Sequence, residues 1–295
     1  MNKSFVTRCT LALSILLATA HVSFAIKTFM LKSSMAKKIV SVRSVSNGGH
    51  MGKGLTVRLS NNTSQEIRIQ VDPALIFVAD QPGYQHLVAV GEETIVLKPA
   101  EEGCLELQTF CGKASAHSPL ANIKYKYWKQ GDPGLVQASR YIKAHALFNS
   151  IGQHAVWMFT DNHSLGNIYS PYDKGSEGRN FVAYLSQITG RKIPEYYTYH
   201  HISERGQVFD PSVSKVFVDL NWNKEYRRTH QVLVFNQRGE LYKVIEGGEV
   251  IDSKGNHNVK VVFDPKKDPP GKYTVQLKDS ENEVLLQKIA VVGAV

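Results

Sequence analysis

The sequence predicts a mainly β protein with two antiparallel β-sandwiches, the first followed by a small α-helical annex. Three observations predict this fold: apolar and polar residues alternate in short runs, turn residues separate the runs, and a central region has helical apolar spacing. Alternation with a period of two is typical of strands that bury one face. The chain has 295 residues, 42% of them hydrophobic and 21% charged, which suits two globular domains.

The first 25 residues are predicted to be a signal peptide. Lys3 and Arg8 form a positive segment, a twelve-residue apolar stretch follows at 9–20, and small residues precede the expected cleavage before Ile26. The stretch is too short for a transmembrane helix, which needs about 20 apolar residues, and no later segment reaches that length. We therefore expect the mature protein to be secreted, periplasmic or on the cell surface.

The charge of the chain limits the kind of partner. The formal net charge is +9, and removal of the signal peptide, which has two basic and no acidic residues, leaves +7. The basic residues are spread in small groups, whereas nucleic-acid-binding proteins usually concentrate them in one stripe. We expect no nucleic-acid partner, and a surface protein or a polysaccharide is the open alternative.

Residues 26–127 are expected to form the first sandwich. Seven alternating runs with turns between them predict its strands, at 40–45, 55–59, 67–71, 75–78, 87–90, 95–97 and 105–107. Many short strands with frequent turns are typical of an immunoglobulin-like sandwich, although the Cys…Trp…Cys framework of antibody domains is absent.

Residues 128–190 are expected to form the annex, because apolar residues there repeat with helical spacing. Helices are predicted at 135–146, 151–159 and 180–189. Gly190 should end the third helix, since glycine tolerates a positive φ. The helices are too short to be stable alone, so they should pack on the first sandwich. Residues 191–205 are interpreted as a linker. Its Tyr/His cluster at 196–201 could bind carbohydrate or pack between the domains, and we expect packing.

Residues 206–295 return to alternation and predict the second sandwich. The stretch Val232–Leu241, which contains an Asn-x-x-Gly turn, is followed by the stretch Pro270–Val275 and a terminal apolar strand. This region resembles the FlgD-like immunoglobulin domains and the C-terminal sorting domains of type IX secretion substrates. The resemblance implies an immunoglobulin-like module displayed by an exported bacterial protein.

The mature chain has two cysteines, Cys104 and Cys111. If both lie on one strand, seven steps of about 3.3 Å separate them by roughly 23 Å. A disulfide requires Cα atoms about 4.4–6.8 Å apart, so a bridge is open only if the chain bends sharply between them. We favour two separate thiols.

An aromatic residue precedes Cys111, and a Gln-x-x-apolar-Trp motif begins at Gln153. This combination resembles the surface thioester domains of Gram-positive adhesins. By that resemblance, Cys111 attacks the side-chain amide of Gln153, expels ammonia and forms an internal thioester, which the lysine amine of a partner can open. Burial of Cys111 as a small apolar residue, with Gln153 on the surface, is the alternative.

Other combinations of reactive side chains match known sites less well. Cys111 with a histidine and Asp161 or Asn162 would suit a cysteine hydrolase, but no local signature of such enzymes is present. The spacing of His154, Asp161 and His163 matches no standard zinc or calcium site. We therefore expect no metal, no cofactor and no catalytic residues.

Three functions follow from these patterns. The first is a non-enzymatic envelope or extracellular module that binds or adheres, with the second sandwich as the display unit. The second is a covalent adhesin with a thioester between Cys111 and Gln153. The third is a hydrolase of surface polymers, against which the missing acid/base pair counts.

Overall fold

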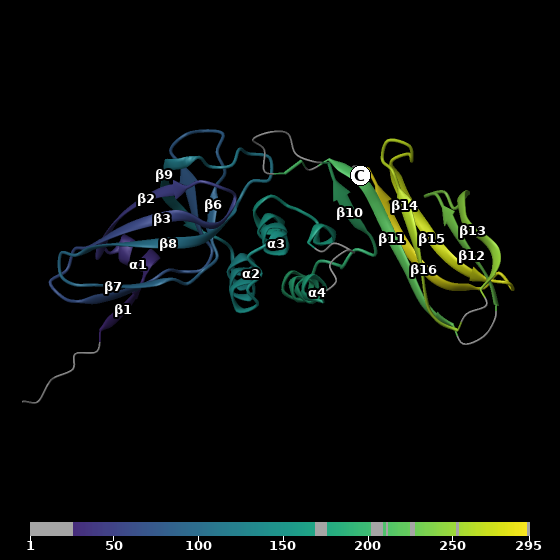
Figure 1. Ribbon diagram of the computed structural model, residues 1–295, viewed down its shortest axis with the longest axis horizontal. Helices are drawn as coiled ribbons and strands as arrows, with labels where there is room; N and C mark the ends of the chain where they lie inside the picture. Colours follow the sequence, from purple (N-terminus) through teal and green to yellow (C-terminus); the bar gives the residue numbers. More distant parts are fainter. Residues whose placement is uncertain are drawn as a thin grey trace, which may run out of the picture.

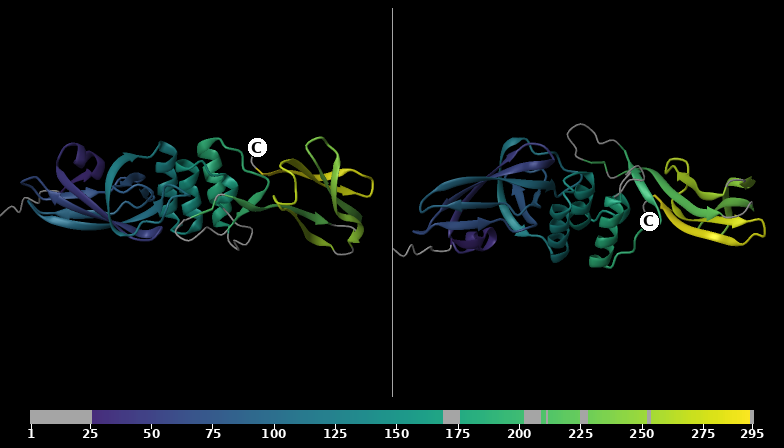
Figure 2. Two further views of the ribbon diagram at one scale, coloured as in Figure 1. Left: turned by 90° about the horizontal axis from the view of Figure 1, so that it is seen from above. Right: turned by 60° about the horizontal axis from the view of Figure 1, so that its bottom comes forward.

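The computed structural model describes residues 26–168, 176–201, 209–210, 212–224, 228–251 and 254–293, so the predicted signal peptide lies outside the described residues. Most of the regular structure in these ranges is strand, and the predicted mainly β class is confirmed. Three of the helices lie between an N-terminal and a C-terminal β body, which gives the molecule an elongated shape (Figure 1, Figure 2). Among the described helices, none has the length and apolar character that a membrane-spanning segment needs.

The first β body contains a closed barrel and a separate three-stranded sheet. The barrel strands, in spatial order, are β2 (Val40–Asn47), β3 (Met51–Asn61), β8 (Glu102–Cys111), β6 (Leu87–Ala89), β5 (Leu75–Ala79) and β9 (Ala121–Gln130). The small sheet has the order β1 (Lys27–Met30), β4 (Ile67–Gln70) and β7 (Thr94–Leu97), and the helix α1 (Leu31–Ala36) follows β1. β1 runs parallel to β4, whereas β4 and β7 are antiparallel.

The closed barrel differs from the open sandwich that the alternation indicates for this body. The seven predicted runs lie in β2 to β8, but β9 is not among them, and β9 pairs with both β2 and β5. Ile123 and Tyr125 of β9 are buried in the same core as Leu55 and Leu107. Because β9 supplies the last apolar face, the sheet closes on itself and removes its free edges.

The three predicted helices are present as α2 (Pro133–Ala144), α3 (Ser150–Thr160) and α4 (Glu177–Thr189), and the short 3-10 helix η1 (Leu165–Asn167) lies between the last two. Asp132 caps the start of α2, and Gly190, with a φ of 69°, ends α4 as predicted. The helices share a buried core with Ile76, Val88 and Phe110 of the barrel. The annex therefore packs on the first β body.

The second β body is a sandwich of two antiparallel sheets. One sheet has the order β10 (Tyr197–His200), β11 (Val213–Lys224) and β14 (Gly255–Phe263). The other has the order β13 (Leu241–Ile251), β12 (Arg228–Phe235), β15 (Gly271–Asp279) and β16 (Val284–Val292). Both sheets contribute to one buried core, for example through Val218 and Val275.

The segment interpreted as a linker contains β10, which pairs with β11. Tyr197 is buried, and its ring stacks on that of Phe217 with 5.2 Å between the centroids. Tyr199 meets the same ring edge-on at 5.0 Å. The aromatic cluster of this segment thus packs on the second β body and extends its sheet.

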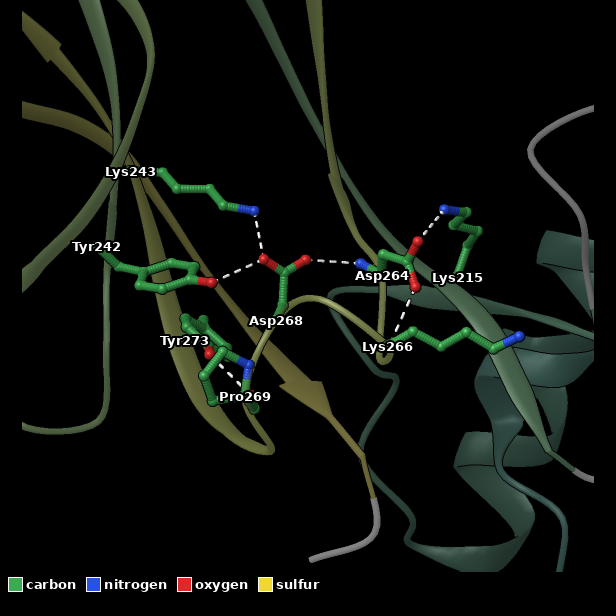
Figure 3. A network of polar contacts seen from close by, with 8 residues as sticks. All are labelled: Lys215, Tyr242, Lys243, Asp264, Lys266, Asp268, Pro269 and Tyr273. Carbon is green, nitrogen blue, oxygen red and sulfur yellow. Dashed lines mark hydrogen bonds and ion pairs between the residues drawn. The ribbon is translucent and has the colours of Figure 1, made fainter.

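Asp268 organises the loop between β14 and β15 (Figure 3). Its buried carboxylate accepts hydrogen bonds from the Tyr242 hydroxyl at 2.8 Å, from the main-chain N–H of Asp264 at 2.6 Å, and from the Lys243 ammonium. Burial, followed by the hydrogen bond to Asp268, raises the pKa of Tyr242 to about 12. The network fixes this loop to β13, the edge strand of the neighbouring sheet.

Candidate functional site

Cys111 and Gln153 meet where the barrel joins the helices. Cys111 is the last residue of β8, and Gln153 lies in the first turn of α3. The main-chain N–H of Cys111 donates to Gln153 Oε1 at 3.0 Å, and Gln153 Nε2 donates to the carbonyl oxygen of Cys111 at 2.8 Å. The structure therefore brings together the two residues that the thioester resemblance singles out.

A glycine lets α3 approach β8 this closely. A Cβ atom added to Gly152 would lie 2.9 Å from the ring of Phe110 and 2.2 Å from the carbonyl oxygen of Leu147. Both separations are shorter than those found for real Cβ atoms, so the position requires glycine. Asn149 caps the helix by accepting from the main-chain N–H groups of Ile151 and Gly152. The cap and the glycine together place Gln153 over the end of β8.

Both side chains of the pair are buried, since Cys111 is 0% exposed and Gln153 is 4% exposed. Burial raises the pKa of the Cys111 thiol to about 12, because a thiolate would lose its hydration there. At neutral pH the residue is therefore a protonated thiol. The Gln153 amide, hydrogen-bonded to the main chain of Cys111, is likewise withdrawn from bulk water.

Trp157, Ala114 and Phe209 surround Cys111 in a small buried cluster. Trp157 follows Gln153 by four residues, so one face of α3 presents both side chains. Phe209 lies just before β11 of the second β body, and its ring centroid is 5.1 Å from that of Trp157. The second β body thus contributes an aromatic cover to the site.

The chain that follows Cys111 is held by buried polar contacts. Gln85 is fully buried, and its Oε1 accepts from the main-chain N–H of Lys113 at 2.8 Å. Asp161, just after α3, accepts from the main-chain N–H of Ala114 at 2.7 Å. These contacts fix the position of Cys111 relative to the helix that carries Gln153.

Three histidines surround Phe209. The ring centroids of His154, His163 and His200 lie 5.2, 5.1 and 4.6 Å from that of Phe209. Burial lowers the pKa of His154 to about 3 and that of His163 to about 4, so both imidazoles are neutral at pH 7. Among the described residues, no hydrogen-bond partner meets the Nδ1 atoms of His154 and His163.

The residues considered for a metal or hydrolase site have other contacts. Asp161 Oδ2 lies 3.9 Å from His163 Nε2 and also accepts a hydrogen bond from the main-chain N–H of Ala114. Asn162 is exposed and accepts from the Arg191 guanidinium at 3.3 Å. Within the described ranges, no three His, Cys, Asp or Glu side chains come together in a way that could hold a metal ion.

No disulfide joins Cys104 and Cys111, as the strand geometry predicts. Both lie on β8, Cys104 exposed and Cys111 buried. Because the strand is extended, the two residues cannot reach each other to form a disulfide. Cys104 therefore provides an internal reference for the reactivity of Cys111.

Gly152, Phe209 and Gln85 are not among the residues that the sequence predicts for the site. Gly152 has a local signal, because it lies inside the predicted helix 151–159, where glycine is unfavourable. Gln85 and Phe209 reach the site from distant parts of the chain, and no local pattern indicates either one.

No protein-family model matches this chain, and no curated protein matches it either. The site is accordingly interpreted from its own geometry.

Proposed function

We propose that the protein is an exported binding module that attaches to its partner covalently, through an internal thioester between Cys111 and Gln153. The observation that carries this proposal is the pair of hydrogen bonds, at 3.0 and 2.8 Å, between the Gln153 side-chain amide and the main chain of Cys111. The buried amide lies against the residue whose sulfur would attack it, and such proximity is the largest requirement of an intramolecular reaction.

The contacts suit the formation of the thioester. The Cys111 sulfur bonds to Cδ of Gln153, the amide C–N bond breaks, and the thiol proton leaves with the amino group as ammonia. Negative charge develops on Oε1 during the attack, and the main-chain N–H of Cys111 already donates to this atom. The leaving amino group is oriented by its hydrogen bond to the Cys111 carbonyl.

Opening of the thioester links the partner. The nitrogen of a partner amine attacks Cδ, the C–S bond breaks, and a proton from the amine ends on the Cys111 sulfur. The product is an amide link between the two proteins and one free thiol. Burial of Cys111 under Trp157 and Phe209 protects the thioester from water until the partner binds.

The proposal does not make the protein an enzyme, because each molecule reacts once. We assign to the second sandwich the role of an immunoglobulin-like display unit on an exported bacterial protein. Its antiparallel sheets and the contact of Phe209 with the site support this role.

Incorporation of methylamine tests the proposal. The chain from Ile26 onward should take up one methylamine at Gln153 and release one thiol at Cys111. The Cys111→Ser and Gln153→Ala variants should take up none, whereas the matched Cys104→Ser variant should react like the parent, since Cys104 is exposed and distant in the strand. A parent protein that takes up no methylamine, or a Cys111→Ser variant that does, overturns the proposal.

A further inference from the structure

A pocket opens beside the Cys111 site, at the junction of the barrel and the helices. Its volume is about 330 Å³. Gly112, which directly follows Cys111, lies in its wall, and Phe159 and Thr160 at the end of α3 contribute to it as well. Ile76 and Leu135 supply apolar surface. An apolar cavity with a few polar groups is the usual form of a ligand site.

A bulge in β9 places an exposed indole at this pocket. The pairing of β5 with β9 runs from Ile76 opposite Lys129 to Phe77 opposite Tyr127, so Trp128 is the extra residue. Bulges re-aim side chains and are frequent next to functional sites. Trp128 is 53% exposed, although it lines the pocket. An indole exposed in this way offers a ligand a flat apolar platform.

The polar groups around Trp128 are mainly cationic. Lys113, Lys129 and His86 line the pocket, and the Lys129 ammonium lies 4.2 Å from the centroid of the indole. The His86 ring meets the indole edge-on at 5.5 Å. Burial, followed by the charges of Lys113 and Lys129, lowers the pKa of His86.

The pocket lining also contains one carboxylate, that of Asp132, which offsets one of the two lysine charges. Asp132 is the N-cap of α2, and its Oδ1 accepts from the main-chain N–H of Leu135 at 2.8 Å. The two lysines still outnumber it, and both of their side chains are exposed. The pocket combines an aromatic platform with available cations.

We propose that this pocket binds an acidic glycan, with a uronic acid ring stacked on Trp128 and its carboxylate paired with Lys113 and Lys129. A sugar ring offers an apolar C–H face for the indole and carries its carboxylate directly on the ring, within reach of both ammonium groups. An acidic peptide would supply the charge without the rigid apolar face that Trp128 matches. The inference goes beyond the thioester and does not depend on it.

Calorimetric titration of the Cys111→Ala protein tests the proposal, because this variant cannot form a thioester and any binding is non-covalent. We expect tetragalacturonate to bind, with an affinity that falls as salt is added. Cellotetraose, a neutral tetrasaccharide, and tetraglutamate, an acidic peptide, should each bind at least tenfold more weakly. No binding of tetragalacturonate, or equal binding of either control, overturns the proposal.

Single substitutions locate the site. Trp128→Ala and Lys129→Gln should each weaken tetragalacturonate binding about tenfold, as loss of one stacking or charge-assisted contact does. Lys124→Gln removes an equal charge from an exposed position on the same strand and should leave the affinity unchanged. Circular dichroism checks that each variant is folded. Unchanged affinity of folded Trp128→Ala, or equal weakening by Lys124→Gln, assigns the binding elsewhere. Retained glycan binding by a protein that takes up no methylamine would refute the thioester alone.

Discussion

The side-chain amide of Gln153 takes the place of a neighbouring strand for Cys111. It accepts from the Cys111 N–H and donates to the Cys111 carbonyl, so both main-chain groups at the end of β8 are paired with one side chain. This arrangement stabilises the junction of α3 with the barrel. The same contact holds the amide beside Cys111, and this proximity supports our proposal of covalent binding.

Loss of the Gln153 amide should destabilise the protein even where no thioester can form. In the Cys111→Ala background, Gln153→Ala leaves two buried main-chain groups without partners, at about 1–3 kcal/mol each. We expect the free energy of unfolding to fall by about 2–4 kcal/mol in urea denaturation. Gln137→Ala, at an exposed position of α2, is the control and should have little effect. Equal stabilities of the two variants would mean that the amide contact is not formed.

The close approach of α3 to Phe110 predicts a strong effect of Gly152→Ala. The added Cβ would collide with the Leu147 carbonyl and the Phe110 ring, and relief of such overpacking costs about 1–3 kcal/mol. Movement of α3 should also abolish methylamine uptake. Gly190→Ala is the control: its φ of 69° makes alanine unfavourable by about 1–2 kcal/mol, but nothing lies within 4 Å and the site is unaffected. Normal methylamine uptake by Gly152→Ala would contradict this description of the junction.

Much of the fold could be predicted from local patterns, but the contacts between elements could not. Leu55, Val57 and Leu59 alternate because one face of β3 is buried, and that pattern predicts a strand wherever it occurs. Closure of the barrel depends on β9 pairing with two strands that are distant in the sequence. The alternation of Ile123 and Tyr125 is a signal for β9, but not for its partners.

The candidate site, too, could be predicted from local patterns only in part. The motifs at Cys111 and Gln153 indicate a pair of residues, whereas the two hydrogen bonds between them depend on how α3 crosses the end of β8. The cover by Phe209 and the pocket at Trp128 depend on long-range packing and on a strand bulge. The hydrophobic periodicity of the sequence indicates neither the cover by Phe209 nor the pocket at Trp128.

The buried histidines should make the protein less stable in acid. The folded-state pKa values of His154 and His163, about 3 and about 4, lie below the ordinary value of 6.5. Between pH 4 and 6.5 the unfolded chain therefore binds protons that the folded protein does not. As the pH is lowered through this range, the free energy of unfolding decreases by up to about 1.4 kcal/mol per pH unit for each histidine. Above pH 6.5 both histidines are neutral in the folded and the unfolded chain, and their full contribution to the free energy of unfolding is present.

Urea denaturation at pH 7.0 and 4.5 measures this loss. The His154→Gln variant should lose less stability between the two pH values than the parent does. His50→Gln, at an exposed position, should behave like the parent. An unchanged pH dependence in His154→Gln would show that this imidazole is not buried in the neutral form.

The Asp268 network should stabilise the second β body without influence on the Cys111 site. Asp268→Ala leaves the Tyr242 hydroxyl and the Lys243 ammonium without their carboxylate, and we expect a loss of about 3 kcal/mol. Glu240→Ala removes an exposed ion pair with Arg238 and should have little effect on stability. Methylamine uptake should be unchanged in both folded variants. A loss of uptake in Asp268→Ala would mean that the network also controls the distant site.

The most direct test of covalent binding is the intact mass of the untreated chain from Ile26 onward, combined with alkylation of its accessible and buried thiols after unfolding. Our account predicts a mass lower than that of the sequence by one ammonia, with alkylation at Cys104 alone. A mass equal to that of the sequence, with alkylation at both Cys104 and Cys111, would contradict it.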